Sequence, residues 1–168
     1  LDDHGRAQGR REDAAGRDEL RFWDETLITE GGRIVTWRTE TLERLATPLA
    51  SAHGEIAPGE GRLSVVPITN APAEQGETAE DALRRRLAET ADKEVWNGAT
   101  LVGPHRDDIC FQLDGRDLAG FASRGQQRTA ILAWKLAQLD LLASESGDPP
   151  LLLLDDVADR ELGGVEAI

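Results

Sequence analysis

The sequence predicts a mixed α/β protein with a long helical arm, and three patterns support this prediction. Apolar residues recur at helical spacing from Leu20 to Leu49. Residues 61–68 (GRLSVVPI) have the composition of a strand. The apolar run 151–154 (LLLL) is followed directly by acids, which is typical of a strand that is buried on both faces of a parallel sheet.

Length, net charge and cysteine content limit the number of domains, the binding partners and the cellular compartment that the sequence allows. Its 168 residues suffice for one ordinary domain, and 32 acidic against 19 basic residues give a formal net charge of −13. This charge repels phosphate backbones, which excludes nucleic-acid binding by the surface as a whole. The single cysteine, Cys110, fits a cytoplasmic protein, and no apolar run is long enough to cross a bilayer. Because the chain has no methionine, we expect it to be a piece of a longer protein.

The chain divides into three segments. Residues 1–16 have almost nothing to bury, so we expect a disordered tip or linker there. Residues 17–56 are expected to form a helical arm, the returning helix of a coiled coil, whose apolar seam needs a partner helix. Gly31 and Gly32 each cost about 1 kcal/mol relative to alanine, which predicts a soft point or break in this arm. Residues 57–168 carry the remaining strands and helices.

In residues 57–168, local signals predict several further elements. Thr78 followed by Asp81 is typical of a capped helix start. The pair Asp114-Gly115 predicts a hairpin turn, and a strong amphipathic helix is expected over residues 124–144. Three further short runs have the composition of strands: residues 100–102, 109–113 and 118–121.

The acids after the apolar run are candidate ligands for a metal ion. Carboxylates at the carboxyl edge of a parallel sheet lie where ligands bind in such folds. In nucleotide-hydrolysing enzymes the first acid, here Asp155, holds magnesium, and its neighbour, here Asp156, orients the attacking water. The alternative is a core strand that is followed by an acidic turn.

The start of the helix predicted at residue 124 is a candidate phosphate site. A helix start exposes backbone N–H groups and a partial positive charge. Gly125 allows close approach, Ser123 supplies a hydroxyl and Arg128 adds a cation. The alternative is a serine cap with polar residues in the first turn.

A third motif, GPHRDD at residues 103–108, lies between two predicted strands. Its side chains suit a metal ion, a proton relay or a phosphate. One histidine beside an arginine is a poor metal site, because the guanidinium repels the cation. We therefore expect a proline-rigidified turn with an ion pair between Arg106 and an aspartate.

The order of the three motifs, GPHRDD, SRGQQR and LLLLDD, resembles the carboxyl-terminal half of the RecF family of recombination-mediator ATPases. The resemblance covers about residues 17–162 and is strongest over residues 98–157. Residues 19–24 (ELRFWD) resemble the returning helix of that family's coiled-coil arm.

The resemblance implies a fold and a site. The fold is a partial ABC-type P-loop ATPase head of the SMC and Rad50 kind, in which two heads dimerise around two ATP molecules. Residues of the signature motif, which contacts the γ-phosphate of ATP on the other subunit, are Ser123, Arg124, Gly125, Gln126 and Arg128. Asp155 is the Walker B aspartate that supports Mg²⁺, and Asp156 stands where many relatives carry the catalytic glutamate.

The resemblance also implies a biological role. RecF proteins act in DNA repair, recombination, replication and the SOS response, at gaps and junctions between single- and double-stranded DNA. Their partners are RecR and RecO, which help to load the RecA recombinase. The implied cofactors here are ATP and Mg²⁺, and the implied assembly is an ATP-dependent homodimer.

Two departures from the family keep alternatives open. No G-x-x-x-x-G-K-[ST] loop occurs in the sequence, so this piece is expected to be inactive as an ATPase alone. Gly163 stands where the family's D-loop carries an acid. The alternatives are a non-catalytic protein-interaction module with a degenerate nucleotide site, and a magnesium phosphoesterase. The phosphoesterase would use four acids: Asp107, Asp108, Asp155 and Asp156.

Overall fold

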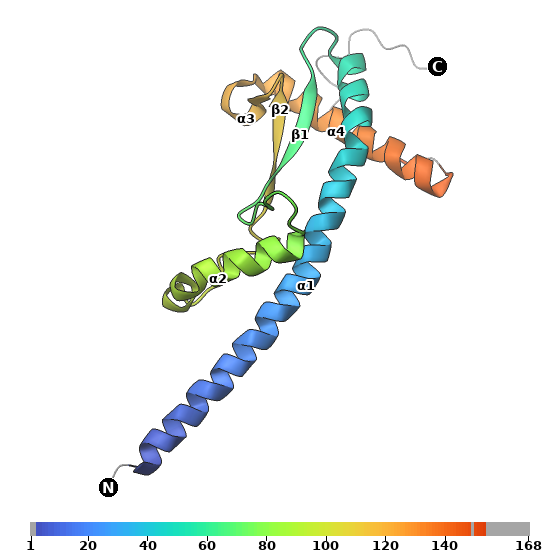
Figure 1. The fold of residues 1–168 in the computed structure, drawn as a ribbon. Helices are drawn as coiled ribbons and strands as arrows, with labels where there is room; N and C mark the ends of the chain where they lie inside the picture. Colours follow the sequence, from blue (N-terminus) through green and yellow to red (C-terminus); the bar gives the residue numbers. More distant parts are fainter. Residues whose placement is uncertain (1–2, 149, 154–168) are drawn as a thin grey trace.

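A single long helix organises the molecule (Figure 1). The computed structural model describes residues 3–148 and 150–153. Helix α1 (Asp3–Ile56) forms the long axis, helix α2 (Ala79–Asn97) crosses it midway, and a small sheet with helix α4 (Arg124–Ser146) lies at its carboxyl-terminal end. The remaining elements are β1 (Leu63–Ile68), β2 (Asp108–Leu113), β3 (Arg116–Asp117) and α3 (Leu118–Phe121).

Helix α1 is longer than the arm that the sequence predicts. It begins at Asp3 and runs through residues 3–16, where a disordered tip is expected. The expectation weighed only the lack of apolar residues, but Ala, Arg, Gln and Glu favour helix even on a solvated surface. Trp23 and Trp37 of the apolar seam are open to solvent, 59% and 56% exposed, whereas Leu45 and Leu49 at its carboxyl-terminal end are buried against α4.

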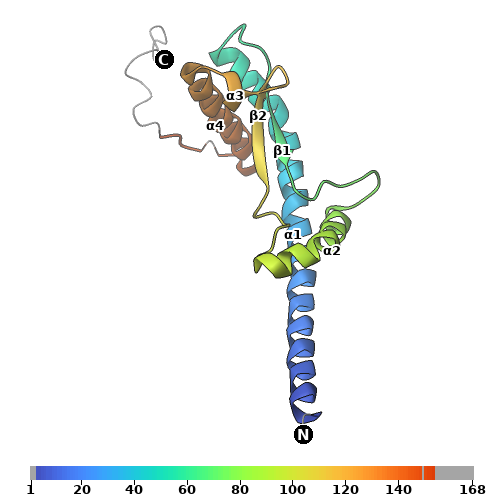
Figure 2. The same ribbon diagram turned by 90° about the vertical axis from the view of Figure 1, so that its left-hand side faces the viewer.

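The break expected at Gly31 and Gly32 does not form, and that prediction is wrong. Both glycines are buried inside a continuous helix. A Cβ atom at Gly31 would lie 3.2 Å from Pro104 Cδ and 3.3 Å from Leu83 Cδ1, and one at Gly32 would lie 3.2 Å from the backbone nitrogen of Glu80. The glycines therefore form a notch into which α2 and the loop at Pro104 fit. Figure 2 shows α2 crossing α1.

The sheet has three antiparallel strands in the order β1-β2-β3. The hairpin between β2 and β3 turns at Asp114 (φ 49°) and Gly115 (φ 77°), the left-handed pair that an Asp-Gly turn requires, so this prediction is confirmed. The returning strand predicted at residues 118–121 does not form, so that prediction is wrong: the strand that pairs with β2 is β3, and residues 118–121 are helix α3. Strand β3 covers only two residues before α3, because the Asp117 carboxylate accepts a hydrogen bond from the Ala119 N–H and starts a helix.

Two other predicted strands do not form among the described residues. Residues 100–102 are irregular because side chains satisfy their backbone: the Leu101 N–H donates to Glu94 Oε1 (2.7 Å) and Asn70 Nδ2 donates to the Leu101 carbonyl (3.0 Å). Residues 151–153 are also irregular, with Leu151 84% and Leu153 83% exposed. A strand buried on both faces needs neighbours on both sides, and these residues pair with none of β1, β2 and β3.

Two apolar cores lie along α1. The first joins α1, α4 and the sheet, and its α4 side consists of small residues: Ala130, Ala133 and Ala137. Phe111 meets Trp134 edge-on beside this core, with ring centres 5.4 Å apart. The second core lies under α2 and consists of Ile28, Ala71, Leu83, Leu87 and Val102. No helix among the described residues is long and apolar enough to span a membrane.

The start of α2 is fixed by polar contacts as well as by packing. Thr78 and Asp81 form the predicted capping box. Arg85 Nε donates to Glu77 Oε1 (2.9 Å), and this hydrogen bond holds the pKa of Glu77 down to about 2. The Glu77 N–H in turn donates to the Glu74 carbonyl (3.0 Å), which closes the loop before the helix.

The glycine notch predicts opposite effects for the same substitution at two sites in α1. Gly54→Ala has open space around its new methyl group and should raise the free energy of unfolding by up to about 1 kcal/mol. Gly32→Ala must push Glu80 aside and should lose this gain or destabilise the protein. Urea unfolding of both variants tests this, and equal stabilisation would show that α2 does not dock in the notch.

The Glu77–Arg85 pair predicts a pH-dependent stability. Because the pKa of Glu77 is lower in the folded state than its ordinary value of 4.5, the stability that this pair contributes is complete above pH 4.5 and is lost as pH falls toward about 2. Glu77→Gln should therefore lower the melting temperature at pH 7, and the difference from the unsubstituted protein should shrink between pH 4.5 and pH 2. Glu60→Gln, an exposed control outside α2, should show no such convergence.

Candidate functional site

The tip of α4 carries the best-defined candidate site. Ser123 has extended backbone angles (φ −62°, ψ 162°) and caps the helix. The Gln126 N–H donates to Ser123 Oγ (3.2 Å), and the Ser123 N–H donates to Gln126 Oε1 (3.0 Å). The predicted helix start is confirmed, and the serine cap that was its alternative interpretation is also present.

The capped tip faces outward. Ser123, Arg124, Gly125 and Arg128 are all exposed. A Cβ atom at Gly125 would have no described neighbour closer than Ser123 Oγ, at 3.8 Å. Glycine in a helix costs about 1 kcal/mol relative to alanine, and no packing contact within the described residues requires it here. The open backbone at Gly125 thus leaves room for a group from outside to approach the first turn.

The charge around this tip is unlike that of the chain. Residues 118–139 contain three basic side chains and no acid, although the whole chain has a net charge of −13. The basic residues are Arg124, Arg128 and Lys135, and all three are exposed. Together with the helix dipole they favour an anion at the start of α4.

The rest of α4 is held firmly. Its alanine face packs against α1, and Arg44 of α1 forms an ion pair with Glu145 near the other end of the helix. Gln127 Nε2 donates to the Ala122 carbonyl (3.3 Å), which ties the chain before the cap to the first turn. These contacts fix the direction in which the tip points.

The GPHRDD loop is a structural connection to α1. Arg38 Nη1 donates to the Pro104 carbonyl (2.6 Å), and Arg106 Nη2 donates to the Thr100 carbonyl (3.0 Å). The ion pair expected between Arg106 and an aspartate is absent from the described residues, so that prediction is wrong. The Arg106 guanidinium instead donates to the Thr100 carbonyl, which has no partner in strands β1, β2 or β3. Asp107 Oδ1 accepts a hydrogen bond from the Asn70 N–H (3.4 Å).

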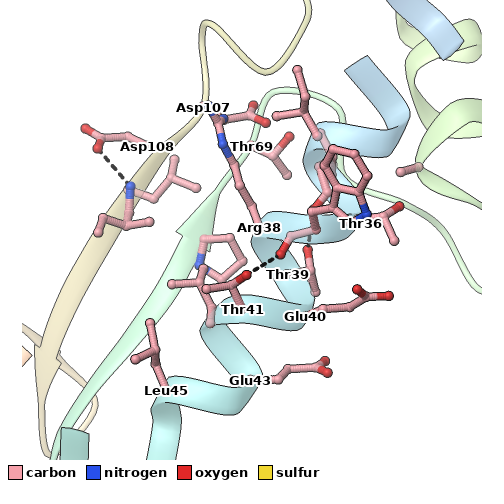
Figure 3. A pocket seen from close by; sticks show the side chains of 18 of the residues that line it. Thr36, Arg38, Thr39, Glu40, Thr41, Glu43, Leu45, Thr69, Asp107 and Asp108 are labelled. Carbon is pink, nitrogen blue, oxygen red and sulfur yellow. Dashed lines mark hydrogen bonds between the residues drawn. The ribbon is translucent and has the colours of Figure 1, made fainter. Parts of the chain in front are cut away.

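A groove of about 820 Å³ lies between α1, β1 and β2 (Figure 3). Figure 3 shows Arg38 reaching from α1 toward the loop that carries Asp107, with Asp108 at the start of β2. The groove follows apolar residues such as Trp37, Ile68 and Ile109. No group of three or more His, Cys, Asp or Glu side chains within residues 3–148 and 150–153 is arranged to hold a metal ion.

Four of the predicted site residues lie in one turn at the start of α4 or at its cap, and Arg128 lies one turn further on. Asp155 and Asp156 lie outside the described residues, as does Gly163. The capping signal was local and could be read from the sequence. An exposed pair beside the tip, Arg116 and Phe121, gave no such signal, because it forms only when β3 turns into α3.

The fold defines a class: a mixed α/β part of an ABC-type ATPase head, here with a helical arm and an exposed, capped helix tip. No protein-family model matches the chain. It is 42% identical over 145 residues to the DNA replication and repair protein RecF of Symbiobacterium thermophilum, which covers 84% of this chain and 39% of that protein. It is 41% identical over 140 residues to RecF of Synechocystis sp., covering 82% of this chain and 36% of that protein.

Two solved structures of the recombination mediator protein RecF in the RecFOR pathway are similar to this chain. The RecF-ATP structure matches with a TM-score of 0.75 and 33% identity over 83% of this chain and 38% of that chain. The RecF-ATPrS structure matches with a TM-score of 0.76 and 32% identity, over 85% of this chain and 39% of that chain. The chain thus corresponds in sequence and structure to the carboxyl-terminal part of RecF proteins, which confirms the resemblance. It spans less than two fifths of the length of these relatives.

The capping box predicts a measurable cost of removing the Ser123 hydroxyl. Ser123→Ala should lower the free energy of unfolding by about 1 kcal/mol and speed amide exchange at Gln126, whose N–H loses its acceptor. Ser51→Ala, which removes an exposed hydroxyl that caps no helix start, is the control and should leave the free energy of unfolding nearly unchanged. Unchanged exchange at Gln126 would mean that Ser123 does not cap α4 in solution.

Proposed function

We propose that this chain supplies one wall of a composite ATP site in a RecF-type DNA-repair ATPase. The exposed, capped tip of α4, with an open backbone at Gly125, carries the proposal. In a head-to-head dimer, Ser123 and the first-turn N–H groups contact the γ-phosphate of ATP that is bound to the other subunit. Arg124 and Arg128 add positive charge at the same point.

The geometry of the tip suits this role. Ser123 Oγ accepts the Gln126 N–H as a cap, and its own hydroxyl proton is free to donate to a phosphate oxygen. Gln126 is held by its bond to the Ser123 N–H, so the first turn is already ordered before a ligand arrives. Preorganised donors of this kind stabilise developing negative charge at little reorganisation cost.

Asp155 and Asp156 complete the proposed site. Asp155 would hold Mg²⁺, whose chemistry when bound is to neutralise phosphate charge, and Asp156 would orient the attacking water. Oxygen ligands are those that Mg²⁺ prefers, and two adjacent carboxylates fit that donor set. This proposal requires a phosphate-binding loop, which the sequence of this chain does not contain.

The biological setting is part of the same proposal. RecF relatives are named as DNA replication and repair proteins, and the solved structures place RecF in the RecFOR pathway. We accordingly propose cytoplasmic action at single- and double-stranded DNA gaps or junctions, with RecR and RecO as partners and RecA as the recombinase served indirectly. With a net charge of −13, this chain would leave most DNA contact to local arginines or to other parts of the protein.

The second candidate is a non-catalytic interaction module. It is favoured by the apolar side chains that the arm and α2 expose, above all Trp96, which is 87% exposed. The two candidates differ in whether the tip of α4 takes part in nucleotide turnover.

ATP turnover by the complete protein tests the assignment. Ser123→Arg should reduce Mg²⁺-dependent turnover at least about a hundredfold, because the bulky side chain fills the phosphate position. Asp155→Asn should reduce turnover similarly. Ser144→Arg places the same side chain on an exposed position near the other end of α4 and should leave turnover unchanged. Turnover that survives both Ser123→Arg and Asp155→Asn would reject the ATPase role in favour of the interaction module.

A further inference from the structure

An exposed arginine–aromatic pair lies beside the tip of α4. The Arg116 guanidinium carbon lies 4.2 Å from the centre of the Phe121 ring, within cation–π range. Arg116 belongs to β3 and Phe121 ends α3, so the pair comes directly before the capping residue in the chain. Phe121 is 41% exposed and belongs to neither apolar core.

The acids on either side of Arg116 are already engaged. Asp114 Oδ1 accepts a hydrogen bond from the Arg62 N–H (2.8 Å), and Asp117 Oδ1 accepts one from the Ala119 N–H (3.0 Å). Arg116 forms no ion pair within the described residues. Its guanidinium lies over the ring and keeps its charge available to a ligand.

The pair is close to the proposed phosphate position. Only Ala122 separates Phe121 from Ser123, so their Cα atoms lie at most about 7 Å apart. A cation and an aromatic face next to a helix tip that suits phosphate form the combination that binds a nucleotide, because bases and sugars stack on such surfaces.

We propose that Arg116 and Phe121 form a platform for the nucleoside part of the triphosphate whose γ-phosphate the α4 tip holds. This inference rests on the proposed function and adds to it a specificity contact. Phe121 offers its free edge and face to the base or ribose, and Arg116 keeps the ring in place and contributes positive charge. The α4 tip thereby binds the γ-phosphate, while Arg116 and Phe121 bind the nucleoside and so distinguish a nucleotide from inorganic polyphosphate.

The complete protein allows a direct test with two probes, ATP and inorganic tripolyphosphate. Phe121→Leu and Arg116→Gln should each raise the KM for ATP about tenfold, the scale of one lost stacking contact, with little change in kcat. Inhibition of turnover by tripolyphosphate, which has no nucleoside, should be unchanged in both variants.

Matched controls exist on the arm. Arg33 lies 5.1 Å from the centre of the Trp37 ring, and Phe22 is 64% exposed, so Arg33→Gln and Phe22→Leu remove the same groups far from the α4 tip. Both should leave the KM for ATP unchanged. Ser123→Arg should reduce ATP turnover at least about a hundredfold, as the proposed function requires.

The outcomes separate the two proposals. Full turnover in Ser123→Arg would overturn the proposed function itself. If Ser123→Arg loses ATP turnover but Phe121→Leu and Arg116→Gln keep the KM for ATP unchanged, only the platform proposal is overturned. If these two variants weaken the binding of ATP and of tripolyphosphate equally, the nucleoside assignment is overturned, since Arg116 and Phe121 would then contact phosphate. Weaker binding of single-stranded DNA with an unchanged KM for ATP would also overturn it, because the platform would then serve nucleic acid.

Discussion

The close packing of α4 on α1 is the constraint on which the rest of the structure depends. Alanines 130, 133 and 137 are at most 1% exposed, and they let the two helices approach around Leu45 and Leu49. Small residues lose little side-chain entropy on burial, so close approach is achieved at low cost. The sheet then covers the remaining side of this core through Leu63 and Leu113. The direction of the α4 tip follows from this packing, and the tip is held in addition by its cap and by Gln127.

Signals that act over a few residues could be predicted from the sequence, and those that depend on distant contacts could not. The caps at Thr78 and Ser123 and the Asp114-Gly115 turn are satisfied within four residues, and all three form. The unbroken helix at Gly31 and Gly32 could not be predicted, because the propensity cost is visible in the sequence while the docking of α2 into the notch is not.

The candidate site shows the same division. The resemblance and the capping signal both pointed to the tip of α4, and the residues expected there do gather at one helix start. Arg116 and Phe121 are brought together by a two-residue strand that passes directly into a four-residue helix, where a longer returning strand is expected. A strand would place side chains of odd and even residues on opposite faces, whereas the turn into α3 brings the guanidinium over the ring.

Helix α1 connects the arm to the site through two independent contacts. The second core and the glycine notch join α2 and the GPHRDD loop to its middle, and the first core joins α4 to its carboxyl-terminal third. Arg38 lies between these contacts and ties the loop to the helix at Pro104. Because a continuous helix curves only gently, α2 and α4, which both pack on α1, are held in a fixed relation to one another. The buried glycines, which predict a break when only the sequence is considered, are therefore the positions at which α2 is fixed to α1, while the alanines of α4 fix the tip to the same continuous helix.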